Sequence, residues 1–175
     1  MERTLTIIKN ESIKRGLVGS IINKIESTGL RLAQLKQVTP TLSIAKKHYI
    51  KDLKWIKGLG EKAKNSFKNS SKLVKVFGTE DEISIGEKIY QWSLKQLANK
   101  EIIVIVWEGN NAVAKVKKIV GDNEPSNADL STVRGMFSSD SYLKSNIEGR
   151  ALYNVVHRSS NLSEAKREIK VWFGK

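Results

Sequence analysis

The stretch that decides the fold is Ile102-Ile103-Val104-Ile105-Val106-Trp107, a run of six apolar residues. A short, continuous apolar run of mostly β-branched residues is typical of a strand that is buried on both faces. Strand-forming residues also cover Arg3–Lys9, Leu30–Val38 and Leu152–His157, and the last of these runs ends in a histidine. The sequence therefore predicts four strands.

Helical patterns separate these strands. The apolar residues of Leu17–Ile25 form one stripe that stops before Gly29, and a short helix capped by Thr41 or Ser43 follows Pro40. Further helices are predicted for 78–99, for 110–121 and after a capping Ser163.

Two segments lack a clear period. Lys54–Lys75 is rich in lysine, and we expect a short exposed helix flanked by loops; Gly121–Gly135 is expected to be an ordered loop. The element order matches a split β-α-β arrangement. The predicted fold class is therefore α+β, an α/β sandwich with a ferredoxin-like, four-stranded antiparallel sheet covered by helices. The length suits a single domain, residues 1–175.

The composition narrows the chemistry. The chain has two histidines and no cysteine, which excludes disulfides, thiol catalysis and cysteine-bound zinc. Its 31 Lys and Arg against 18 Asp and Glu give a net charge of +13, which favours phosphate-bearing partners. No apolar run is long enough to span a membrane and the N-terminus has no secretory pattern, so we expect a cytoplasmic protein with no membrane partner.

Several polar residues that can take part in chemistry lie in or close to the predicted strands and helices. In chain order they are Lys9, Tyr49, Lys117, Arg134, Asn154, His157, Ser159 and Glu168. Their sequence context resembles the nucleoside diphosphate kinase family over Arg3–Phe173. The resemblance rests on four blocks in the same order. They are TLTIIK from Thr4 with KRGLVG from Lys14, VWEGNNAV from Val106, STVRG from Ser131 with Phe137, and NVVHRS from Asn154 with Ala165, Glu168, Ile169, Trp172 and Phe173.

The resemblance implies an enzyme, a nucleoside diphosphate kinase, that works by a ping-pong mechanism. A nucleoside triphosphate gives its γ-phosphoryl group to His157, and the phosphohistidine passes it to a nucleoside diphosphate. Imidazole suits this role because its pKa lies near neutrality. Glu168 would orient the ring, Ser159 would hydrogen-bond that carboxylate, and Lys9 would neutralise charge during the transfer.

The resemblance also implies a nucleotide site formed by Lys9, Tyr49, Lys117, Asn123, Arg134 and Asn154. Mg²⁺ is the expected cofactor, carried by the nucleotide phosphates, because no carboxylate cage is visible in the sequence and no protein metal site is predicted. The family forms dimers that stack into tetramers or hexamers, so a homo-oligomer is expected. We read His48, which has no matching role, as a residue on a helix surface.

The chain departs from the family pattern within the site. Lys117 stands where the family has an arginine, and Asn123 where it has a threonine. Arg158 follows the histidine in place of a small residue, where it is expected to crowd or neutralise the phosphorylated site. The base-stacking phenylalanine has no clear counterpart, since Ile89 and Tyr90 occupy its region. Inserts are expected at about 54–88 and 138–149.

The sequence is also consistent with a second class of function, a binding protein. A catalytically weak protein on the same fold would use its net charge of +13 to bind nucleotides, RNA, DNA or another acidic partner. The histidine, its carboxylate and the basic positions occur together, and a protein that only binds has no need of a nucleophile. We therefore favour the phosphotransferase and treat nucleic-acid binding as secondary.

Overall fold

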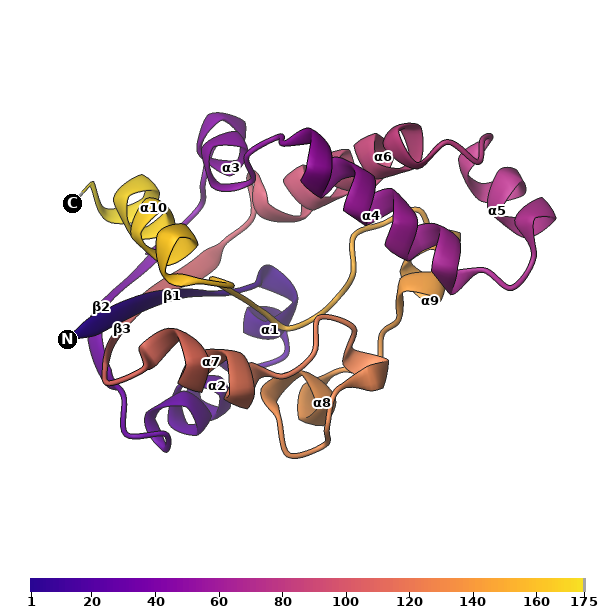
Figure 1. Ribbon diagram of the computed structural model, residues 1–175. Helices are drawn as coiled ribbons and strands as arrows, with labels where there is room; N and C mark the ends of the chain where they lie inside the picture. Colours follow the sequence, from indigo (N-terminus) through magenta and orange to yellow (C-terminus); the bar gives the residue numbers. More distant parts are fainter. Residues whose placement is uncertain (175) are drawn as a thin grey trace.

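The central sheet has the predicted antiparallel topology. The computed structural model, which describes residues 1–174, places the four strands in the order β2-β3-β1-β4 (Figure 1). The strands are β1 (Glu2–Ile8), β2 (Arg31–Val38), β3 (Ile102–Gly109) and β4 (Val156–Arg158). The apolar run that opened the sequence analysis is the interior strand β3, which pairs with both β1 and β2.

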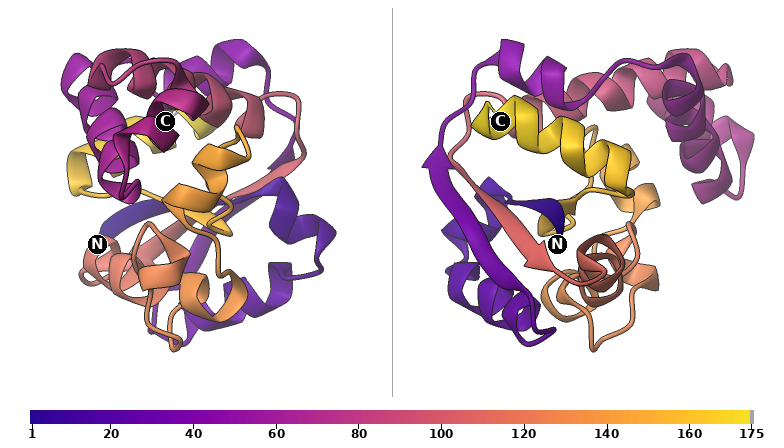
Figure 2. Two further views of the ribbon diagram at one scale, coloured as in Figure 1. Left: turned by 90° about the vertical axis from the view of Figure 1, so that its right-hand side faces the viewer. Right: turned by 60° about the vertical axis from the view of Figure 1, so that its left-hand side comes forward.

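Helices cover both faces of the sheet, as Figure 2 shows from two further sides. They are α1 (Asn10–Lys14), α2 (Val18–Glu26), α3 (Leu42–His48), α4 (Leu53–Ser66), α5 (Ser70–Phe77), α6 (Glu82–Leu97), α7 (Ala112–Val120), the 3-10 helix η1 (Pro125–Asn127), α8 (Val133–Phe137), α9 (Tyr142–Ile147) and α10 (Leu162–Phe173). No helix in this described part of the chain combines the length and apolar character that crossing a bilayer requires.

Alternation along the strands divides the core into two layers. On one face Leu5 and Ile7 of β1 pack with residues of α6 and α10, including Leu94 and Trp172. On the other face Ile8 packs with residues of α2 and α7. Because helices cover both faces of the sheet, nearly every residue of β1 and β3 is buried.

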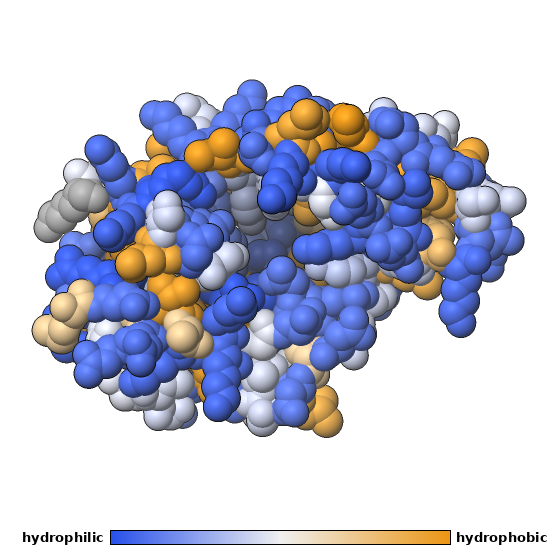
Figure 3. Space-filling view, viewed as in Figure 1, coloured by the Kyte–Doolittle hydropathy of each residue, from blue (hydrophilic) through white to orange (hydrophobic). Residues whose placement is uncertain are grey.

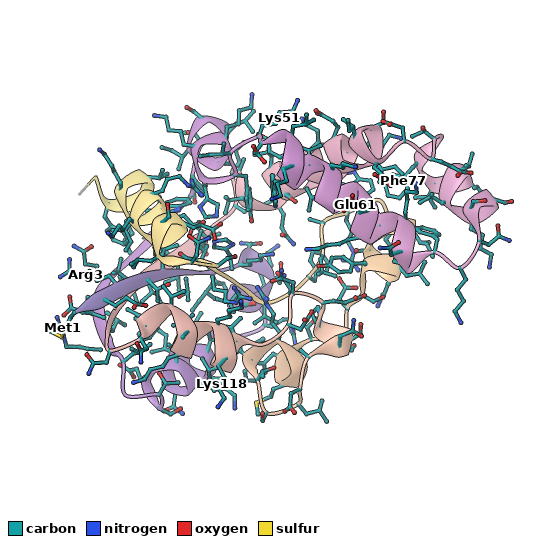
Figure 4. The ribbon with its side chains drawn as sticks, in the orientation of Figure 1. Met1, Arg3, Lys51, Glu61, Phe77 and Lys118 are labelled. Carbon is teal, nitrogen blue, oxygen red and sulfur yellow. The ribbon has the colours of Figure 1, made fainter. Side chains whose placement is uncertain are left out.

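The segment expected to be a short exposed helix with loops is different in the structure, and that prediction was wrong. It forms the 14-residue helix α4 and the eight-residue helix α5, which extend with α6 away from the sheet. A small core of its own holds them together, formed by Ala63, Leu73, Phe77 and Ile85. Figure 4 labels Phe77 in this group, at the opposite end of the molecule from Met1. Most lysines of this segment are exposed, and in the sequence they obscure the apolar residues that form the small core.

The last part of the chain also departs from prediction. The fourth strand was expected over 152–157, but only Val156–Arg158 is paired in the sheet. Val155 has a φ of 69°, a left-handed conformation that a β-branched residue rarely adopts and that interrupts a strand. The segment expected to be an ordered loop contains η1 and the start of α8, and Asn161 rather than Ser163 caps α10.

Candidate active site

A cleft opens beside the free edge of β4. It has a volume of about 620 Å³ and is lined by residues of α4, α6, α9 and α10 and by the loops that precede β4. Figure 3 shows it as a hollow near the middle of one face, with hydrophilic residues around much of its rim. Of the predicted site residues, Lys9, Tyr49, Asn123, Arg134, Asn154 and His157 line it.

His157 is fixed in the cleft by two residues of the C-terminal segment. It lies opposite Ile7 of β1, and its side chain is 17% exposed. Its Nε2 is 3.0 Å from Oε1 of Glu168, which is buried on α10, and Ser159 Oγ donates to Glu168 Oε2 at 2.6 Å. The predicted bond between Ser159 and the carboxylate is confirmed. Because an ionised carboxylate can only accept hydrogen bonds, this contact assigns the proton to Nε2 and leaves Nδ1 as the ring nitrogen with a free lone pair.

The surroundings keep this imidazole neutral. Burial lowers the pKa of His157, and the charges of Lys9, Arg134 and Arg158 lower it further, against the raising effect of Glu164. Burial raises the pKa of Glu168, although the hydrogen bond from Ser159 acts in the other direction. A neutral imidazole with one nitrogen tied to a carboxylate is a nucleophile at physiological pH.

His48 is not on the surface, as the sequence analysis expected, but buried behind His157. The two ring centroids are 4.5 Å apart and nearly perpendicular. Trp172 Nε1 donates to His48 Nδ1 at 3.2 Å, and burial lowers the pKa of His48 to about 3. The ligand atoms of His48, His157 and Glu168 lie within 4.8 Å of one another, as in a metal site. Hydrogen bonds engage His157 Nε2, both oxygens of Glu168 and His48 Nδ1, whereas His48 Nε2 is buried without a partner among the described residues.

Lys9 enters the cleft from the end of β1. Its Nζ donates to Gln96 Oε1 at 2.9 Å and to Asn154 Oδ1 at 2.6 Å. Burial lowers the pKa of Lys9 to about 8, while Glu11 opposes the shift. Because both acceptors are neutral amides, the ammonium group retains its charge for an anionic ligand and has a third donor to offer.

Arg134, on α8, connects the loops around the cleft through hydrogen bonds. It donates at distances from 2.8 to 3.3 Å to the carbonyls of Gly121, Asp122, Asn154 and Val156 and to Asn123 Oδ1. Burial and then the charge of Arg158 lower its pKa to about 9. Asn154 Nδ2 in turn donates to the carbonyl of Asn123 at 3.2 Å. Lys9, Asn123, Arg134 and Asn154 therefore belong to one hydrogen-bonded network.

Lys117 is placed differently from the other predicted site residues. It is exposed on α7 and is not among the residues that line the cleft within 1–174. Its role in nucleotide binding remains a prediction.

An aromatic residue that the sequence analysis missed lines the cleft. Trp55 of α4 stacks on Tyr49, with ring centroids 5.9 Å apart and planes 14° from parallel. Tyr90 is in the core and supports Trp55 edge-on, whereas Ile89 does reach the cleft. Trp55 belongs to the apolar face of α4. A prediction of this helix from the spacing of its apolar residues would therefore have identified Trp55.

The family model described as nucleoside diphosphate kinase matches residues 2–55 and 62–175. This chain belongs to the nucleoside diphosphate kinase family. The family match confirms the predicted enzyme class, a nucleotide-binding phosphotransferase.

Individual relatives extend the match along the chain. The nucleoside diphosphate kinase of Pyrobaculum aerophilum is 36% identical over 174 residues, covering 99% of this chain and 95% of that protein. That of Borreliella burgdorferi is 31% identical over 173 residues, covering 99% and 87%. In both cases the match covers most of the relative's own length.

Solved structures of nucleoside diphosphate kinases have the same fold. The crystal structure of the kinase from Pyrobaculum aerophilum has a TM-score of 0.91 at 34% identity, covering 98% of this chain and 95% of that one. A transition-state mimic of the kinase from Borrelia burgdorferi, with bound vanadate and ADP, has a TM-score of 0.78 at 31% identity, covering 98% and 86%. These likenesses confirm the predicted ferredoxin-like fold.

Proposed function

We propose that the protein moves the γ-phosphoryl group of a nucleoside triphosphate to a nucleoside diphosphate in two steps through His157. In the first step the Nδ1 lone pair forms a bond to the γ-phosphorus while the bond from that phosphorus to the bridging oxygen breaks. The nucleoside diphosphate leaves with that electron pair. In the second step a terminal oxygen of another nucleoside diphosphate attacks the phosphohistidine and Nδ1 leaves.

One observation carries this proposal: the hydrogen bond of 3.0 Å between His157 Nε2 and the buried Glu168. It leaves Nδ1 as the nucleophile, and Glu168 stabilises the positive charge that the ring acquires when Nδ1 is phosphorylated. Ser159 holds the carboxylate in place. A purely structural histidine does not need to be tied in this way beside a cationic cleft.

The cations of the cleft would bind the phosphates. Lys9 and Arg134 lie on two sides of Asn154, and their charge offsets the negative charge of the transferring group. Mg²⁺ belongs to the substrate in this proposal. The carboxylates that line the cleft are Asp52 and Glu164, which do not form a cluster, so the ion would be held by the nucleotide phosphates.

The base would lie toward the α4 and α6 side of the cleft. Trp55, Leu59 and Ile89 line that side, and Ala151 and Leu152 line the cleft from the segment before β4. These apolar groups suit a stacked base, and stacking tolerates any base, so weak base selectivity is expected. Tyr49 and Asn154 would contact the phosphates and the sugar, and Asn123 would act through Arg134.

Two-substrate kinetics test the proposal. With ATP as donor and a pyrimidine nucleoside diphosphate as acceptor, double-reciprocal plots at several acceptor concentrations should be parallel. His157→Ala should lose the activity, and Lys72→Gln, which changes an exposed lysine on α5, should keep it. Intersecting lines or an active His157→Ala variant would contradict the mechanism.

Nucleic-acid binding is the second candidate because of the net charge of +13. It predicts an affinity that falls steeply with salt, since phosphate contacts release counterions. The buried Ser159, Glu168 and His157 arrangement has no use in such a role. We therefore place it second.

A homo-oligomer and a cytoplasmic location complete the proposal. β2 is an edge strand of the sheet, and Leu35 on it is 46% exposed, which fits an edge that pairs with a second copy. The family membership supports the location. Light scattering of the purified protein, giving a mass above that of one chain, tests the assembly.

A further inference from the structure

Arg158, directly after His157, is a buried cation without a partner. Only 8% of the residue is exposed, and its Nε has no hydrogen-bond partner. Across the described residues, 1–174, its guanidinium makes neither a hydrogen bond nor an ion pair within 4.0 Å. A buried charge in this state is unfavourable unless a ligand or solvent satisfies it. The residue lines the same cleft as His157.

The nearby protein charges do not satisfy it. Glu164 and Asp122 are close enough to act on the pKa of Arg158, but neither is within ion-pair distance. Arg134 has the same sign, and each of the two guanidinium groups works against the charge of the other. Over the cleft as a whole, positive side chains outnumber negative ones, which favours an anion: the lining includes Lys9, Lys62, Arg134, Arg150, Arg158 and Arg167 but only two carboxylates, Asp52 and Glu164.

The other arginines of the cleft are already engaged. Arg134 uses its nitrogens on backbone carbonyls and Asn123, and Arg167 donates to the carbonyls of Lys47 and His48 at 3.0 and 2.9 Å. Arg150 pairs with Asp140 at 2.6 Å. Arg158 differs from these arginines because its donors are free.

Arg158 and His157 leave β4 in different directions. His157 lies opposite Ile7 of β1 and Arg158 opposite Thr6, so the two side chains leave the strand on opposite faces. β4 is an edge strand, and a long side chain can reach the cleft around its free edge. Both His157 and Arg158 line the cleft, although their side chains leave β4 on opposite faces.

We propose that Arg158 binds the phosphoryl group that moves to and from His157, by donating to its non-bridging oxygens. The planar guanidinium can offer two parallel donors to such a group, which an ammonium group cannot. It would supply this contact from β4, a different element from α7, which carries Lys117. This inference rests on the proposed function and assigns a further residue to its site.

Arg158→Gln and Arg158→Lys test it by single-turnover phosphorylation of His157 with ATP. Arg158→Gln should lower the rate about 10- to 100-fold, the range for losing a hydrogen bond to a charged group, and Arg158→Lys should restore part of it. ADP affinity should change by less than about twofold, because ADP lacks the transferred group. Lys72→Gln, which also removes one positive charge but on the exposed side of α5, should leave the phosphorylation rate and the ADP affinity unchanged.

Two thermal measurements separate ligand binding from a structural role. Without nucleotide, Arg158→Gln should melt at the same or a higher temperature, because it removes an unpaired buried charge. With ADP, the added stabilisation that vanadate gives the wild type should be lost in Arg158→Gln. An unchanged or faster phosphorylation rate in Arg158→Gln, with vanadate still stabilising it, would overturn the proposal. If the wild type is not phosphorylated at all, the proposed function fails instead.

Discussion

At the scale of single residues, the reactivity of His157 depends on groups far from it in sequence. Glu168 fixes its Nε2, and Lys9 comes from the other end of the chain. Glu168→Gln is expected to slow His157 phosphorylation about 10- to 100-fold, because it removes the charge that stabilises the phosphorylated ring. Single-turnover kinetics measure this. Glu164→Gln, which changes an acid at the start of the same helix, should have a smaller effect, and equal losses would contradict the role of Glu168.

The pH profile follows from two lowered pKa values. Because burial and nearby cations lower the pKa of His157, its neutral, reactive form should persist below the ordinary histidine value of about 6.5. The phosphorylation rate should thus stay level between about pH 6 and 7. It should fall as the pH rises through the Lys9 pKa of about 8, where the ammonium group loses its charge.

Single-turnover rates from pH 5 to 9 measure this profile. Lys9→Arg is the matched variant, because an arginine stays charged and should flatten the alkaline fall. A rate that rises through pH 6.5 as an ordinary histidine titrates would contradict the assignment of the lowered His157 pKa.

Lys117 gives a separate residue-scale prediction. Lys117→Arg should hold or improve turnover, because a guanidinium can bind phosphate oxygens with two donors. Steady-state kcat/KM for ATP measures it. A large loss would show that Lys117 does not occupy the place that the family resemblance gives it.

At the scale of elements, the packing of α4 on α6 depends on two glycines. A Cβ at Gly60 would lie 1.9 Å from the carbonyl oxygen of Glu82, and one at Gly86 would lie 2.0 Å from that of Ile56. Gly60→Ala and Gly86→Ala should each lower the free energy of unfolding by about 1–3 kcal/mol, the usual cost of overpacking. Gly58→Ala, in the same helix with open space around it, should be neutral or stabilising. Urea unfolding compares the three, and equal stabilities would contradict the close helix contact.

The sequence predicts the elements best where one physical signal dominates. The apolar run of β3 and the stripe of α2 identify their elements, because burial dictates both patterns. The helix in the α4 segment was predicted too short, because its many lysines obscure a narrow apolar face. The fourth strand was predicted too long, because the left-handed Val155 is held by tertiary hydrogen bonds to Ser12, Lys9 and Glu11 and not by local preference.

The candidate site is predictable in its residue types and less so in its contacts. The strand-end His157, with Ser159 and Glu168 after it, can be read from the blocks of sequence. His48 and Trp55 were not found, because their burial depends on how α3 and α4 pack around the cleft. Sequence alone also cannot show that Arg158 lacks a protein partner.

At the scale of the whole molecule, the net charge of +13 and the cleft act over different ranges. Binding of a DNA oligonucleotide, if it occurs, should weaken steeply between 50 and 200 mM salt, because it depends on surface charge. The rate of phosphorylation at saturating ATP should change less than about threefold over that range, because the reacting groups are shielded from counterions. Parallel measurements of both test the separation, and an equally steep fall in the two would contradict it.

The central claim is that His157 carries the phosphoryl group on Nδ1, and nuclear magnetic resonance of the phosphorylated protein tests it most directly. Protein labelled with ¹⁵N in histidine and treated with excess ATP should show phosphorus coupled to Nδ1 of one ring, a signal that is lost in acid, survives in base and is absent from His157→Ala. Phosphorus on Nε2, on another residue or on no residue would contradict the account.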